Sequence, residues 1–110
     1  MNAILLEINN GIATITLNRP DKLNAFNRAM AFAMQQALDD CKSDTVRCVM
    51  ITGAGKAFSA GQDLAEVVDL NGPGMDKILS EHYNPIITRI RALEKPVLAC
   101  INGVAAGAGA

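Results

Sequence analysis

The sequence predicts an α/β fold, and two features carry that prediction. Short β-rich segments alternate along the chain with segments whose apolar residues recur at helical spacing. Two of the β-rich segments, residues 46–52 and 97–101, are continuous apolar runs, which are typical of strands buried on both faces. Alternation of this kind favours strands and helices packed in layers over an all-helical or all-β chain.

The first half begins with a predicted hairpin. Residues 3–8 and 12–17 are rich in strand-forming side chains and flank Asn9-Asn10-Gly11, and an Asn-Gly pair between two such runs favours a tight turn. Residues 27–42 then change to helical periodicity, with Asn24 or Asn27 as the candidate N-cap. The run 46–52 follows as a buried strand.

The second half contains two small-residue loops. Residues 53–56 and 57–64 are expected to be loop up to a helix start, and Asn71-Gly72-Pro73-Gly74 is a strong chain breaker. A helical stripe covers residues 75–93, where Pro85 predicts a kink or a fresh helix start. After the strand at 97–101, the glycine-rich residues 102–110 lead toward another helix, so we expect the chain to be part of a longer protein.

Composition narrows the functional class. The 110 residues are half apolar with a net charge of −1 and no basic cluster, which argues against a nucleic-acid partner. We expect a cytoplasmic protein, because the sequence has no membrane-length apolar stretch and no basic segment before its first apolar residues. Cys41, Cys48 and Cys100 lack metal-ligand spacing and are expected to be buried thiols, and His82 alone cannot build a metal site.

Nucleotide motifs fail at specific positions. The P-loop pattern around Gly55-Lys56 would need glycine where Met50 stands and a hydroxyl residue where Ala57 stands, and Phe58 replaces the third glycine of a dinucleotide fingerprint. The loops 58–64 and 102–110 remain. Small residues beside a helix start can expose main-chain N–H groups to a carbonyl oxygen that becomes negative during a reaction, but the same pattern also suits ordinary tight turns.

Several motifs, in this order, resemble the crotonase (enoyl-CoA hydratase/isomerase) family from residue 18 to residue 110. They are Asn18-Arg19-Pro20 with Asn24-Ala25, Ala57 to Leu64, Lys95-Pro96-Val97, Asn102-Gly103 and Gly107-x-Gly109. Gly61-Gln62-Asp63 together with residues 104–109 is similar to the phenylacetate-pathway branch, which isomerises a ring-epoxidised phenylacetyl-CoA. The resemblance implies a spiral of ββα units, with residues 1–110 as the N-terminal part of one domain that ends after the strand leading into the second oxyanion-hole loop.

The resemblance also implies roles for individual residues. The main-chain N–H groups of Gln62 and Ala108 correspond to the family's oxyanion hole, which stabilises the enolate of a coenzyme A thioester. Coenzyme A would arrive as part of the substrate, with no separate cofactor and no metal. Its contacts would include residues at the positions Lys22, Ala25, Ala60, Asp63 and Leu64. Lys22 also suits an ordinary solvated lysine, and Asp63 suits a helix cap better than a catalytic role.

The acid and base positions of the family lie beyond Ala110, so no proton-transfer residue is assigned. Two alternatives therefore stay open: a sister activity such as a thioester hydrolase, decarboxylase or dehalogenase, and a non-catalytic fragment. Glu66, Asp69 and Glu81 do not match the family's acid/base motif, while Tyr83 and His82 suit a packed tyrosine and an exposed histidine better than an acyl pocket. Relatives form trimers, often paired into hexamers, and the resemblance implies the same assembly here.

Overall fold

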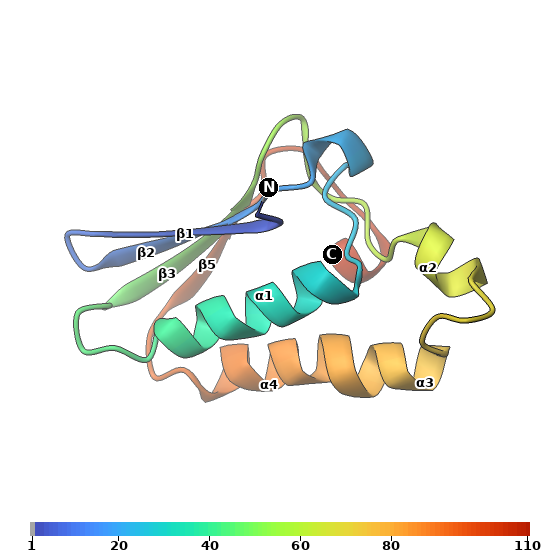
Figure 1. The fold of residues 1–110 in the computed structure, drawn as a ribbon. Helices are drawn as coiled ribbons and strands as arrows, with labels where there is room; N and C mark the ends of the chain where they lie inside the picture. Colours follow the sequence, from blue (N-terminus) through green and yellow to red (C-terminus); the bar gives the residue numbers. More distant parts are fainter. Residues whose placement is uncertain (1) are drawn as a thin grey trace.

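The computed structural model describes residues 2–110 as a sheet with helices packed on one of its faces (Figure 1). The main sheet has the order β1-β2-β3-β5, with β1 and β2 antiparallel and the other neighbours parallel. Its strands are β1 (Ile4–Asn9), β2 (Ile12–Leu17), β3 (Cys48–Gly53) and β5 (Val97–Cys100). The α/β prediction is confirmed, and parallel neighbours arise because helical connections return the chain to the same end of the sheet.

The predicted hairpin forms around a two-residue turn. Asn9 pairs with Ile12, which leaves Asn10 and Gly11 to make the reversal, and both have positive φ (53° and 83°). Asparagine and glycine tolerate this left-handed backbone better than other residues, and turns of this kind match the twist of the flanking strands. The Asn-Gly pair thus sets the register that turns Ala13, Ile15 and Leu17 toward the core.

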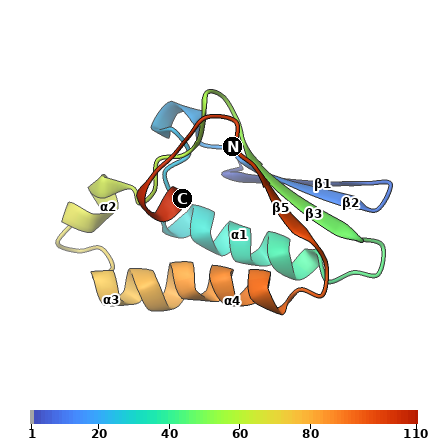
Figure 2. The same cartoon turned by 180° about the vertical axis from the view of Figure 1, so that it is seen from behind.

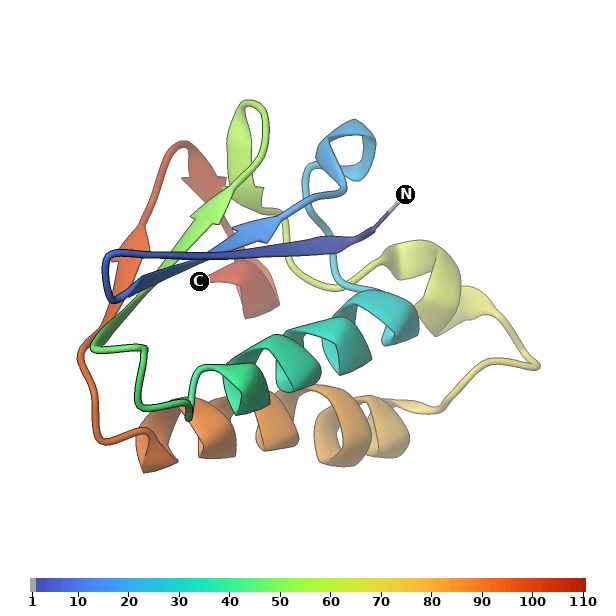
Figure 3. The ribbon, with the colours of Figure 1, turned by 60° about the vertical axis from the view of Figure 1, so that its left-hand side comes forward.

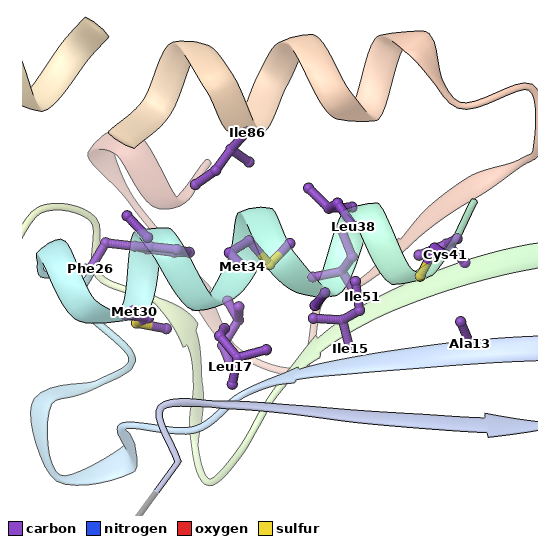
Figure 4. Close-up of a cluster of buried hydrophobic side chains, with 14 of the residues drawn as sticks. Ala13, Ile15, Leu17, Phe26, Met30, Met34, Leu38, Cys41, Ile51 and Ile86 are labelled. Carbon is purple, nitrogen blue, oxygen red and sulfur yellow. The ribbon is translucent and has the colours of Figure 1, made fainter. Parts of the chain in front are cut away.

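Helix α1 (Arg28–Asp40) begins at one of the two predicted caps. The Asn27 side chain accepts a hydrogen bond from the N–H of Met30 at 2.9 Å. The buried face of the helix carries Met30, Ala31, Met34, Ala37 and Leu38. Figure 4 shows Met30, Met34 and Leu38 of this face with the strand residues Ile15 and Leu17 on one side and Ile86 of the neighbouring helix on the other. Full burial of each large side chain here contributes about 1.5–3 kcal/mol.

The second helical stretch changes its pitch. It runs through α3 (Met75–Lys77), a π-helical segment (Ile78–Tyr83) and α4 (Asn84–Ala92). Pro85 lies in the first turn of α4, but Tyr83 and Asn84 before it keep right-handed helical dihedrals, so the chain changes pitch just before the proline and does not start a new helix. Helix α4 lies beside α1 in both Figure 1 and Figure 3, and the two helices form the layer under the sheet.

Two short strands were missed by the sequence prediction. Strand β4 (Ala57–Ser59) and strand β6 (Val104–Ala105) lie inside segments expected to be loops, and they pair in parallel as a second, two-stranded sheet. The two runs are only three and two residues long, so periodicity gives no signal. Figure 2 shows the green segment after β3 running alongside the red segment after β5.

Burial corrects two expectations. The run 97–101 forms a strand, but Leu98 is 51% exposed and Ile101 is 62% exposed within residues 2–110, so the prediction of a buried strand is wrong here. Of the three cysteines only Cys41 is buried, and Cys48 and Cys100 are partly exposed free thiols. None of the helices formed by residues 2–110 combines the length and the apolar character that a membrane crossing requires.

Candidate active site

The two glycine-containing loops meet at one end of the molecule because two parallel strands lead into them. Ser59 of β4 pairs with Ala105 of β6, and the Ala106 N–H donates to the Ser59 carbonyl at 3.1 Å. Parallel neighbours end at the same edge, so the chain leaves both strands on the same side. The second loop can come this close to β4 because residue 109 is glycine: an added Cβ would lie 2.3 Å from the Ser59 carbonyl oxygen.

The peptide unit between Gly61 and Gln62 is oriented by the hydrogen bond that its carbonyl accepts. The Phe26 N–H donates to the Gly61 oxygen at 2.7 Å, and the Asp63 N–H donates to the Phe26 oxygen at 2.8 Å. Because a trans peptide points its C=O and N–H in opposite directions, the Gln62 N–H faces away from Phe26. Among residues 2–110 this N–H has no hydrogen-bond acceptor.

The second loop, residues 106–110, lies next to Gly61 of the first loop. A Cβ placed on Gly61 would lie 3.2 Å from the Ala108 nitrogen and 2.9 Å from the Ala106 oxygen. Ala108 sits in a single 3₁₀ turn (Gly107–Gly109), where the N–H groups of Gly109 and Ala110 bond within the loop, while those of Gly107 and Ala108 have no acceptor in the described chain. Main-chain N–H donors without an acceptor on adjoining loops are the groups from which an oxyanion-binding site is built.

Asn24 links the segment after β2 to the β3–β4 turn and to β4, and it was not among the predicted site residues. It is fully buried with φ 56°; its side-chain oxygen accepts from the Arg19 N–H at 2.8 Å, and its side-chain nitrogen donates to the Ala54 and Ala57 carbonyls at 2.9 Å each. The Asn24 carbonyl accepts from the Ser59 hydroxyl at 2.8 Å. Its place in the Asn24-Ala25 motif was the available signal, but sequence cannot distinguish a buried hydrogen-bonding hub from a turn residue.

Asp63 caps a helix and pairs with an arginine. Its carboxylate accepts from the Ala65 N–H at 2.9 Å at the start of α2 (Leu64–Val68), which confirms the capping interpretation. The other carboxylate oxygen lies 3.1 Å from the Arg19 guanidinium, and both side chains are less than one-fifth exposed. Arg19 also donates to the Ala25 carbonyl at 2.6 Å, so it ties the segment after β2 to the first loop.

The structure brings the segments of the other predicted contact residues together. The Ala60 N–H donates to the Leu23 carbonyl at 2.9 Å, so Ala60 and the segment containing Lys22 and Ala25 lie on neighbouring strands of chain. Lys22 and Ala60 are exposed, whereas Ala25 is buried and contributes its carbonyl to Arg19. Leu64 is 74% exposed at the first turn of α2.

An apolar cavity of about 200 Å³ opens beside the second loop. Most of its lining comes from the strands, α1 and α4, Ala108 and Tyr83 also contribute, and no acidic side chain does. The lining residues are Leu17, Phe26, Met34, Ile51, Phe58, Ser59, Tyr83, Ile86, Ile87, Ile90, Ala99, Ala108, Gly109 and Ala110. An aliphatic and aromatic lining with few polar atoms accommodates hydrocarbon groups.

Next to the first loop lies a buried polar cluster that the sequence did not predict. His82 is 1% exposed, which makes the expectation of an exposed histidine wrong, and its Nδ1 has no hydrogen-bond partner in the described chain. Burial lowers the pKa of His82 below the usual 6.5, opposed by the Glu66 carboxylate 3.9 Å away and assisted by Arg28. Burial, with a contribution from Glu66, raises the pKa of Tyr83 to about 12.

Acidification is expected to destabilise the fold through His82. The folded state keeps this histidine neutral below pH 6.5, whereas the unfolded state takes up the proton, so the free energy of unfolding falls from about pH 6.5 toward the lower folded pKa. The slope from this one proton is at most ~1.4 kcal/mol per pH unit. Urea titrations between pH 7.5 and 5 on the wild type and His82→Phe measure it. An equal slope in both proteins would assign the pH dependence to other groups.

The fold and the site together define an α/β protein of the crotonase type, in which two small-residue loops follow a pair of parallel strands. No three potential ligand side chains converge as a metal site within residues 2–110. The family model described as enoyl-CoA hydratase/isomerase matches residues 7–110, and the chain belongs to this family.

Individual relatives share this fold and cover the whole chain. It is 46% identical to the 1,2-epoxyphenylacetyl-CoA isomerase of Escherichia coli and 38% identical to a short-chain-enoyl-CoA hydratase of Clostridium acetobutylicum, over 100% and 99% of its length. It covers 44% and 42% of those two proteins. A solved enoyl-CoA hydratase of Mycobacterium smegmatis superimposes with a TM-score of 0.88 at 33% identity, over 99% of this chain and 43% of that one. The chain thus spans less than half the length of these relatives.

Proposed function

We propose that the protein binds an acyl-CoA thioester and stabilises its enolate through the main-chain N–H groups of Gln62 and Ala108. The single observation that supports this most directly is the pair of unbonded N–H groups on adjoining loops, with the Ala108 nitrogen 3.2 Å from the Cβ position of Gly61. Two preorganised donors on the thioester oxygen lower the barrier to losing the α-proton, each by about 3 kcal/mol. The matching family contains enzymes named for enoyl-CoA chemistry.

The coenzyme A moiety would lie along the exposed edge formed by Lys22, Ala60 and Leu64, with Ala25 and Asp63 holding that edge in shape. Lys22 is the exposed cation of this group and suits a phosphate, whereas Ala25 and Asp63 are engaged with Arg19. The thioester carries its own coenzyme A, so we propose no separate cofactor. Assembly into trimers or hexamers and a cytoplasmic location belong to the same proposal.

Within the family, an isomerase acting on an epoxidised phenylacetyl-CoA is the reaction we propose first. Its support is the 46% identity to a protein of that name, together with Gly61-Gln62-Asp63 and residues 104–109. Hydration of an enoyl-CoA belongs to the same leading proposal, whereas a sister activity, such as a thioester hydrolase, decarboxylase or dehalogenase, would use the same two donors with different acid and base groups. Turnover of matched substrates for each reaction by the whole protein separates these possibilities.

Calorimetry tests the binding proposal directly. We expect heat of binding with acetyl-CoA or a longer acyl-CoA, and weaker binding with free coenzyme A, because the free thiol lacks the carbonyl that the two donors contact. Absence of binding at millimolar acyl-CoA would overturn the proposal. The experiment applies to the 110-residue chain and to the whole protein.

A second candidate is that the 110-residue chain binds ligand without turning it over. One observation favours it: the cavity beside Ala108 is lined by no carboxylate, so the described residues offer no carboxylate acid or base there. Measurable hydration or isomerisation by the 110-residue chain, with its intact mass verified, would rule this candidate out.

A further inference from the structure

The Gln62 side chain is held by partners from two other elements. Its Oε1 accepts from the Tyr83 hydroxyl at 2.5 Å, and its Nε2 donates to Glu66 Oε1 at 3.3 Å and to the Asp63 carbonyl at 3.2 Å. A phenol donates and a carboxylate only accepts, so these partners specify which end of the carboxamide faces each of them. The side chain is therefore fixed in position and in orientation.

The partners are themselves anchored. Glu66 Oε2 accepts from the Arg28 N–H at the start of α1 at 2.9 Å, and the Arg28 guanidinium reaches Glu81 at 2.5 Å. The Tyr83 ring packs edge-on against Phe26 with centroids 6.1 Å apart, and Phe26 is the residue that bonds the Gly61 carbonyl. One cluster thus joins α1, α2 and the π-helical segment Ile78–Tyr83 around a single side chain.

The π-helical segment explains how Tyr83 arrives there. Wider turns of this type insert one extra residue and change which side chains face a given direction, and they occur often at functional sites. Here the segment turns consecutive side chains inward: Glu81 and His82 reach Arg28, and Tyr83 reaches Gln62. Tyr83 also lines the cavity that Ala108 borders, so it lies between Gln62 and the apolar part of the candidate site.

We propose that Tyr83 and Glu66 are positioning residues, which hold the Gln62 main-chain N–H in its oxyanion-binding orientation through the Gln62 carboxamide. This proposal rests on the proposed function and adds the groups that control the donor. Gly61, with φ 102°, gives the peptide unit before Gln62 wide rotational freedom. The Phe26 hydrogen bond fixes one side of that unit, and the carboxamide anchor removes the remaining freedom on the Gln62 side.

Geometry of this kind affects the chemical step more than ground-state binding. A donor that drifts by a fraction of an ångström still allows the coenzyme A portion to bind, but it no longer meets the oxygen as negative charge develops. Loss of the Tyr83 hydroxyl is therefore expected to lower kcat and to leave KM nearly unchanged. The phenol keeps its proton throughout the working pH range, so the effect should not follow a pH titration of this group.

Tyr83→Phe in the whole protein is the test, because it removes one hydroxyl and keeps the packed ring. We expect kcat to fall on the order of tenfold with KM changed less than about twofold. The infrared carbonyl stretch of a bound ¹³C-labelled acyl-CoA, which the oxyanion donors shift to lower frequency, should move back toward its value in water. Gln36→Ala is the matched control, because Gln36 is an exposed glutamine on α1 that bonds only Asp40 at 3.0 Å.

Further variants guard against a folding defect. Glu66→Gln should reproduce the kcat loss, and Tyr83→Phe added to Gln62→Ala should cause no further loss, since both act through one carboxamide. If wild-type protein fails to bind acyl-CoA, the proposed function is overturned and this proposal with it. If the wild type binds and shows the shifted carbonyl, but Tyr83→Phe keeps both the shift and kcat, only the positioning role is overturned. Additive losses in the double variant would also overturn it.

Discussion

Replacing Gly61 with alanine is expected to reduce kcat/KM for acyl-CoA on the order of 100-fold, the loss found when an oxyanion donor is removed. Gly61 has φ 102°, a conformation that L side chains rarely adopt. Its new methyl group would lie 2.9 Å from the Ala106 oxygen and 3.2 Å from the Ala108 nitrogen. Both contacts are with main chain, which cannot rotate away, so the second loop must retreat from the first.

Gly11→Ala is the matched control for backbone strain. Gly11 has a similar positive φ of 83°, but it lies in the β1-β2 turn, and its closest neighbours would be flexible Arg47 side-chain atoms at 3.4 Å. We expect Gly11→Ala to lower stability and to retain kcat/KM. Steady-state kinetics of both variants, with thermal melts to confirm folding, make the comparison. Equal activity in a folded Gly61→Ala protein would show that the spacing of the loops does not matter.

The sequence predicted best those elements whose signals are local. The Asn9-Asn10-Gly11 turn and the Asn27 cap depend on a few adjacent residues, and both form where expected. The short strands β4 and β6 are different, because each is stable only through pairing with a segment almost 50 residues away. No short-range pattern reports such pairing. The apolar run at 97–101 shows a preference for burial, but it cannot show what covers Leu98.

The candidate site residues also differ in whether their signals are local in the sequence. The prediction for Gln62 and Ala108 came from the resemblance of their glycine-containing motifs to the crotonase family, and the structure brings their loops together. Tyr83 was set aside as a packed tyrosine, since nothing in its neighbours indicates a hydrogen bond to a side chain 21 residues earlier. The π-helical pitch that aims it at Gln62 arises from tertiary packing. Hydrogen bonds between polar side chains on different elements cannot be predicted from a single sequence.

Asn24→Ala is expected to lower the free energy of unfolding by about 2–4 kcal/mol, because two main-chain groups lose their side-chain partner and a third, the Ala57 carbonyl, keeps only its longer bond from Asn102 at 3.2 Å. The Arg19 N–H and the Ala54 and Ala57 carbonyls all bond this carboxamide at 2.8–2.9 Å. Leaving a buried donor or acceptor unsatisfied costs about 1–3 kcal/mol each, although partial relaxation and water entry reduce the sum. Urea denaturation measured by circular dichroism gives the change.

Asn10→Ala separates the hydrogen bonds from the backbone conformation. Asn10 has almost the same φ as Asn24 (53° against 56°) but lies exposed in the β1-β2 turn, so it isolates the cost of placing alanine in the left-handed region, about 1 kcal/mol. The additional loss of free energy of unfolding in Asn24→Ala then measures the contribution of the Asn24 side-chain hydrogen bonds. Because the Asn24 side chain also bonds the carbonyl of Ala57, the first residue of β4, its loss should loosen β4 and with it both loops. We therefore expect acyl-CoA binding to weaken at temperatures where the variant is still folded. A stability loss no larger than that of Asn10→Ala would mean that water replaces the carboxamide and that the hub does not hold the site.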